Sequence, residues 1–162
     1  MTLNSLKEKG YYIEIVIIIV SIIFLGIYFL KPSFYEIKYV KKAEIVEKNL
    51  IELRVALEKY YQVAGHYPEL TKEGAADNLR ILDYTNEKGI FISFADIYGS
   101  NSLKPTEDTE KLIRTNRIID TNDFKNSELN GGWLYDASGQ TGEIHPNLPK
   151  NTYFQNIIWT ER

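Results

Sequence analysis

The apolar run of residues 15–30 constrains this chain more than any other feature. Thirteen of its sixteen residues are Ile, Val, Leu or Phe, and the exceptions are Ser21, Gly26 and Tyr28. At roughly −0.3 to −0.6 kcal/mol each, those thirteen side chains favour insertion into a bilayer by about 4–8 kcal/mol. Because a helix of about 20 residues crosses the hydrocarbon layer, we predict a transmembrane helix over residues 11–32.

A cleaved secretory signal is the rival interpretation of this run. The apolar core is longer than a typical signal has, and the sequence Lys-Pro-Ser-Phe of residues 31–34 follows it where a small-x-small cleavage site would stand. Both observations favour the transmembrane helix.

Glu14 is an acidic residue at the start of the run. A charge at mid-membrane costs about 2.5–3.5 kcal/mol, so the carboxylate must be tolerated or used. It either lies at the interface and reaches water, or is a buried partner for a cation from a neighbouring subunit.

Residues 33–64 have the pattern of a second helical stretch, and Pro32 before them kinks or breaks a helix. Apolar side chains recur at alternating spacings of four and three residues, which is typical of one buried helix face. They are Tyr39, Ala43, Val46, Leu50, Leu53, Leu57, Tyr60 and Ala64. Charged residues cover the rest, and Gly65 and Pro68 end the pattern. The stripe either forms a coiled coil between chains over 36–64 or packs on the chain's own sheet. Since it lasts under four heptads and about 100 residues follow it, we favour the second.

Residues 66–162 break into short pieces that predict an antiparallel sheet. The expected strands are 90–94, 117–120, 133–135 and 143–145, with an exposed hairpin loop at 136–142, a surface loop at 99–110, a helix or strand at 79–84 and an edge strand at 151–159. The predicted fold class is therefore α+β and pilin-like. A long N-terminal helix, with a transmembrane and an amphipathic half, packs on a small antiparallel sheet.

Composition argues against several function classes. Cysteine is absent, which excludes disulfides and thiolate chemistry, and the net charge of −3 is spread along the chain without a basic face for nucleic acid. The sequence has no nucleophile elbow, zinc-protease, Walker or dinucleotide motif. His66 and His145 lie where packing or solvation explains them, and Asp136 and Glu143 flank the hairpin without a recognisable series of metal ligands. We expect no enzyme, no cofactor and no metal.

Four features give the chain a resemblance to the type IV pilin family, which includes the pseudopilins of type II secretion and competence systems. A short leader with lysines ends at Gly10, and an apolar helix with one early glutamate, Glu14, begins at the aromatic Tyr11. The segment LEKYYQVAGHYPEL (57–70) is similar to a pilin helix end, and GGWLYDASGQTGEIHPN (131–147) to the last pilin hairpin.

The resemblance implies a processing and assembly mechanism. A prepilin peptidase would remove the leader 1–10 after Gly10 and methylate Tyr11. Glu14, one place earlier than the family's glutamate, would pair with the N-terminal amine of an adjacent subunit. Pro32, the twenty-second residue after Gly10, stands where many pilins have a proline.

The resemblance also implies a location and partners. The chain would cross the inner membrane with residues 33–162 outside the cytoplasm, and would then enter a periplasmic or extracellular filament. Its partners would be other pilin or pseudopilin subunits, the peptidase, the assembly platform and the bilayer, with no nucleic acid. A pilus, a secretion pseudopilus and a competence filament stay open. The alternative function is a membrane-anchored scaffold or signalling protein that dimerises through a coiled coil at 36–64.

Overall fold

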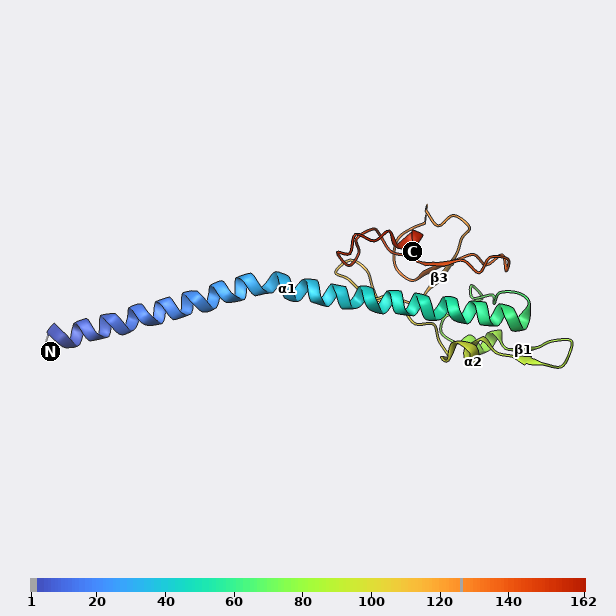
Figure 1. Ribbon diagram of the computed structural model, residues 1–162, viewed down its shortest axis with the longest axis horizontal. Helices are drawn as coiled ribbons and strands as arrows, with labels where there is room; N and C mark the ends of the chain where they lie inside the picture. The colour runs from blue at the N-terminus through green and yellow to red at the C-terminus, as the bar shows by residue number, and fades with distance from the viewer. Residues whose placement is uncertain (1–2, 126) are drawn as a thin grey trace. The chain divides into compact units, whose positions relative to one another are not determined.

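The computed structural model describes residues 3–125 and 127–162, and for residues 3–11 and 31–33 it describes the backbone alone. It is an α+β structure with one long N-terminal helix and small sheets (Figure 1). Its elements are the helix α1 (Leu3–Ala64), the 3-10 helix η1 (Leu79–Leu82), strands β1 (Tyr84–Thr85) and β2 (Phe91–Ile92), the helix α2 (Phe94–Tyr98), strands β3 (Ile118–Asp120), β4 (Trp133–Tyr135) and β5 (Ile144–Pro146), and the 3-10 helix η2 (Trp159–Glu161). The chain divides into two compact units, Met1–Tyr39 and Val40–Arg162.

The helix α1 runs through position 32 without interruption, so of the two predicted effects of Pro32, a kink or a break, the break is wrong. A proline removes one hydrogen bond and costs about 3 kcal/mol, which the intact turns on both sides outweigh. The helix ends as the sequence predicts. Gly65 adopts a left-handed φ of 78°, and its amide donates to the carbonyl oxygen of Tyr61 at 2.8 Å.

The apolar stripe of the second half of α1 is covered by the chain itself. Ala64, at the end of the helix, is half-buried. The other members within the second unit are at most 4% exposed, namely Ala43, Val46, Leu50, Leu53, Leu57 and Tyr60. Polar side chains beside the stripe reach other parts of the same unit. Asn49 donates to the carbonyl oxygen of Pro105 at 3.0 Å, and Arg54 donates to that of Ile144 at 2.7 Å. The predicted packing of this helix face on its own chain is confirmed.

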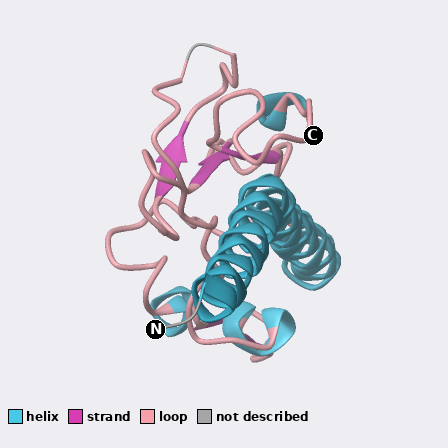
Figure 2. Ribbon diagram, turned by 90° about the vertical axis from the view of Figure 1, so that its left-hand side faces the viewer, coloured by secondary structure: helices cyan, strands magenta, loops and turns pink. Residues whose placement is uncertain are grey.

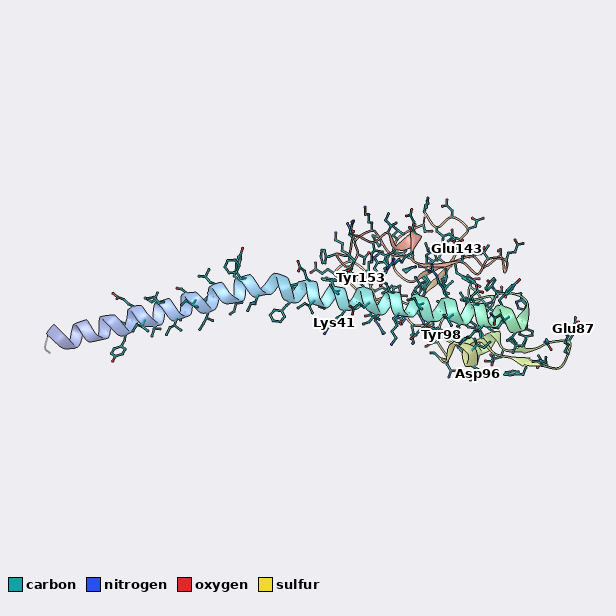
Figure 3. The ribbon with its side chains drawn as sticks, viewed as in Figure 1. Lys41, Glu87, Asp96, Tyr98, Glu143 and Tyr153 are labelled. Carbon is teal, nitrogen blue, oxygen red and sulfur yellow. The ribbon has the colours of Figure 1, made fainter. Side chains whose placement is uncertain are left out.

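Elements of the second unit cover α1 from two sides (Figures 1 and 2). The sheet β3–β4–β5 lies on one side of the helix, and α2 with the hairpin β1–β2 lies on the other. Figure 3 shows the same division, with Glu143 and Tyr153 on the first side and Asp96 and Tyr98 on the second. A helix between two layers must be apolar over more than a narrow seam, which explains why Ala56 is buried beside the stripe.

The sheet is mixed, which corrects the prediction that it is antiparallel. Strand β4 pairs antiparallel with β5, as the hairpin signals predict, but β3 pairs with β4 in parallel, with Ile118 opposite Trp133. The difference follows from the connections. A tight loop can join only antiparallel neighbours, whereas the twelve residues 121–132 are enough for the chain to return and pair in parallel.

A close approach of two backbones fixes the start of β4. The amide of Trp133 donates to the carbonyl oxygen of Arg117 at 2.8 Å. Gly132 precedes it at a φ of 81°, and a Cβ at this position would lie 2.2 Å from that same oxygen. Trp133 is wholly buried, as predicted, and its indole nitrogen donates to the carbonyl oxygen of Lys104 at 2.9 Å. The turn thus requires glycine, and it aims the largest side chain of the hairpin into the core.

Two predicted strands differ from the structure: one is shorter than expected and the other is absent. The strand expected at 90–94 stops at Ile92, because Ser93 caps a new helix by accepting a hydrogen bond from the amide of Asp96 at 3.2 Å. The tail 151–159 is not an edge strand. The rings of Tyr153 and Trp159 lie 5.5 Å apart, whereas six extended residues would separate them by about 20 Å.

The structure also shows the burial of the segment 99–110 and the secondary structure of the segment 79–84. The expected surface loop 99–110 holds Leu103 and Thr106 inside the unit, at 2% and 0% exposure. The hydroxyl of Thr106 accepts a hydrogen bond from the amide of Gly132 at 2.8 Å, so this segment is part of the support of β4. The segment 79–84, for which periodicity left helix or strand open, is the 3-10 helix η1 followed by the first residue of β1.

Candidate functional site: the apolar half of α1

The apolar half of α1, which we define as residues 12–30, exposes its side chains on every side of the helix. None of its described residues is buried, and Phe24 and Tyr28 are 71% and 74% exposed. Figure 3 shows side chains projecting from both edges of this part of the ribbon. A soluble surface seldom exposes more than a few hundred Å² of contiguous apolar area. This helix is long and apolar enough to cross a membrane.

The hydroxyl inside this half is already satisfied. Ser21 donates to the carbonyl oxygen of Ile17, one turn earlier, at 2.8 Å. Together with the helical backbone, this hydrogen bond leaves no donor of Ser21 to be desolvated without a partner in hydrocarbon. A Cβ at Gly26 would meet no heavy atom within 4 Å outside the local helix backbone.

Glu14 lies exposed on α1 between Ile13 and Ile15. Among the residues that the structure describes, none makes a hydrogen bond or ion pair with its carboxylate. A carboxylate in apolar surroundings requires a cation and further hydrogen bonds, or it stays costly. The geometry therefore leaves Glu14 available to a group from outside the chain.

The other predicted site residues are placed by backbone only. Gly10 and Tyr11 lie within α1, four and three residues before Glu14, so the three are about one helical turn apart. Pro32 also lies within α1. The side chains of Tyr11 and Pro32 are outside the described part of the chain, and their predicted roles stay predictions.

A polar cluster lies between α1 and β5. His145 contacts a carboxylate oxygen of Glu143 through Nε2 at 2.9 Å, and its side chain is only 9% exposed. Arg54 donates to the carbonyl oxygens of Ile144 and Arg162. Burial lowers the pKa of Arg54, and the charge of Glu143 partly offsets this. These contacts tie the last strand and the C-terminal segment to the helix.

Arg54 is the residue of this cluster that sequence reasoning missed. The charge pattern assigns it to the solvated face of the helix, yet it is half-buried. Its position directly after Leu53, at the edge of the apolar stripe, is the signal that could have identified it. Among the described residues, no three His, Asp or Glu side chains gather in a way that could hold a metal ion.

The chain was compared with models of protein families, with curated proteins and with solved structures, and none of the three comparisons found a match.

Proposed function

We propose that this chain is a structural subunit of a filament of the type IV pilin kind, held in a membrane by the apolar half of α1 before assembly. One observation carries the proposal: the two halves of α1 are covered differently. In the second half, the apolar stripe is buried by the unit that follows it, while residues 12–30 expose their apolar side chains all round. The uncovered half requires lipid first, and the packed helices of other subunits could then replace the lipid.

Glu14 gives the proposal its chemistry. Cleavage after Gly10 would create a charged amine at Tyr11, and the amine of a neighbouring subunit could pair with the carboxylate of Glu14. Both groups would be out of water, so each would be costly alone and stabilised together. A helical filament supplies the same partner to every copy, which makes one such pair enough to set the register of assembly.

The coiled-coil scaffold is less well supported. A coiled coil over 36–64 would use the apolar seam of Leu50, Leu53 and Leu57. Those side chains are at most 2% exposed within a single chain, so the seam is already occupied. A dimer through this seam would require the second unit to open.

Mass spectrometry on the mature chain tests the processing step. The chain should be expressed in cells that carry a prepilin peptidase and compared with the same cells lacking it. We expect a chain that begins at methylated Tyr11 in the first case and an intact Met1 in the second. An intact Met1 in both would move the assignment to the scaffold.

A pair of alanine substitutions tests the assembly step. Glu14→Ala should stay in the membrane, because removing a charge favours insertion, yet its incorporation into filaments should fall at least about tenfold. Glu36→Ala is the matched control, since Glu36 is an exposed glutamate of α1 beyond the apolar half. Normal assembly of Glu14→Ala would mean that the carboxylate only reaches water at the interface.

A further inference from the structure

Three polar side chains of the apolar half share one face of α1. Glu14, Ser21 and Tyr28 are spaced seven residues apart, and all three are exposed. Seven residues of an α-helix make two turns to within about 20°, so the three form a line along the helix. We call this line the heptad face. Tyr35, a further seven residues on and 54% exposed, extends it.

The heptad face lies inside the hydrocarbon if the apolar half spans the membrane. Ser21 is the midpoint of residues 12–30, and Glu14 and Tyr28 each lie seven residues from it, about 10 Å along the axis. Half the hydrocarbon thickness is about 15 Å. Tyr12 is the remaining polar side chain of this half, and it stands at the end of the run and on the opposite side of the helix.

Hydrocarbon offers no hydrogen-bond partner to the carboxyl group of Glu14 or the hydroxyl of Tyr28, so a face that gathers polar side chains fits protein better than lipid. A second copy of the same chain fits it chemically. A tyrosine hydroxyl both donates and accepts, so Tyr28 can pair with Tyr28 of a second copy. The hydroxyl of Ser21 donates to Ile17, and its oxygen can still accept a hydrogen bond from that copy. Two copies inserted by the same route are parallel, which sets Ser21 beside Ser21 and Tyr28 beside Tyr28.

We propose that the heptad face is where a second copy of this chain packs inside the bilayer, in parallel and before any filament forms. A seven-residue repeat keeps two helices in contact through a left-handed supercoil. The inference rests on the proposed membrane anchoring, and it assigns a side to the helix that the apolar composition alone leaves undefined. Lipid covers the opposite side, where Ile23 lies.

Single cysteines test the face, because the chain has no cysteine of its own. Ser21→Cys and Ile23→Cys place a thiol at nearly the same depth but about 200° apart around the helix. Each full-length variant is reconstituted in phosphatidylcholine vesicles at low density and oxidised with copper phenanthroline. We expect at least about fivefold more covalent dimer for Ser21→Cys. Equal yields would mean random collision and would overturn the proposal, as would no dimer from either variant.

A second comparison uses variants that keep the shape of the face. The double variant Ser21→Ala with Tyr28→Phe removes both hydroxyls, while Tyr12→Phe removes one from the opposite side. Energy transfer between labelled copies should give a dimer dissociation constant roughly three- to tenfold larger for the double variant and unchanged for Tyr12→Phe. An unchanged dissociation constant in the double variant would contradict hydrogen bonding across the face.

An alkaline carbonate wash separates this inference from the proposed function. If the wash strips all variants from the vesicles, membrane anchoring fails and the proposed function fails with it. If they resist the wash but Ser21→Cys forms no excess dimer, anchoring stands and the heptad face alone is overturned.

Discussion

The two halves of α1 share one backbone and differ in what covers their side chains. Residues 12–30 are rich in Ile and Val, which are only moderate helix formers, yet they are as helical as the amphipathic stretch that follows. In the second half, packing against the unit supports the helix, and Leu53 is wholly buried. In the first half the chain supplies no such support, and a membrane would enforce the helix because every backbone group must be satisfied internally. One continuous helix can thus be stabilised by protein packing in one half and by a membrane in the other.

The largest effect should come from the glycine at the start of β4. Gly132→Ala places a Cβ 2.2 Å from the carbonyl oxygen of Arg117 at a φ that alanine rarely adopts. We expect a loss of at least about 4 kcal/mol, enough to unfold the second unit, measured by denaturant titration of the full chain in detergent. Gly139→Ala is the control, because Gly139 has a similar φ of 77° but a Cβ there would meet no heavy atom within 4 Å. The difference between the two variants measures the cost of the clash apart from the cost of the backbone conformation. Gly26→Ala, in the apolar half, should cost nothing.

Trp133 and Phe24 are aromatic residues with opposite surroundings. Trp133→Ala empties a buried site and should lower the free energy of unfolding of the second unit by about 3–5 kcal/mol. Phe24→Ala should leave that free energy unchanged, because its ring is 71% exposed within the chain. Equal losses in the two variants would show that the halves of α1 fold as one cooperative body.

The same contrast holds for leucine. Leu53→Ala should destabilise the second unit by about 2–5 kcal/mol, while Leu25→Ala should only weaken membrane insertion slightly. Thermal unfolding in detergent measures the first quantity, and extraction by alkaline carbonate measures the second. Stability of Leu53→Ala at the level of the parent chain would contradict the packing of the stripe on its own unit.

The smallest expected effect is a loss of stability of the second unit at alkaline pH, which is absent at neutral pH. Burial raises the pKa of Tyr60, Tyr135 and Tyr153 in the second unit. Since their neutral forms are favoured in the folded state, the stability they contribute is complete below about pH 10 and declines as the pH rises further. Ultraviolet titration should show a group of tyrosines that ionise only as the unit unfolds. Tyr153→Phe should make this decline shallower.

Local signals predicted the parts of the fold that depend on neighbouring residues. The stripe of α1, its end at Gly65 and the strand of Trp133 all follow from spacing and turn chemistry within a few residues. The parallel pairing of β3 with β4 depends instead on contacts between segments far apart in sequence. The capping of α2 by Ser93 was hidden because the segment IFISF (90–94), in which four of five residues are apolar, also fits a strand.

The candidate site divides in the same way. The exposure of Glu14 within an apolar helix follows from composition alone. The burial of Arg54 does not, because it depends on carbonyl oxygens of Ile144 and Arg162, which lie 90 and 108 residues away. The spacing of residues in the sequence cannot predict such distant partners. A charged residue at the edge of a helical stripe can therefore be either solvent-exposed or half-buried.

Polar contacts along α1 also have a mechanical consequence. Lys42 pairs with Asp108 at 2.9 Å, and Arg162 with Glu47 at 2.5 Å. Further along the helix, Glu52 pairs with Lys104, and Arg54 holds the carbonyl oxygens of two segments. A force along the helix axis would load these contacts together, in shear, rather than open them one after another. Resistance to such a force depends on the rate of unfolding rather than on equilibrium stability. If the chain is pulled by this helix, as the proposed assembly would require, the second unit is therefore expected to unfold at high force and in one step.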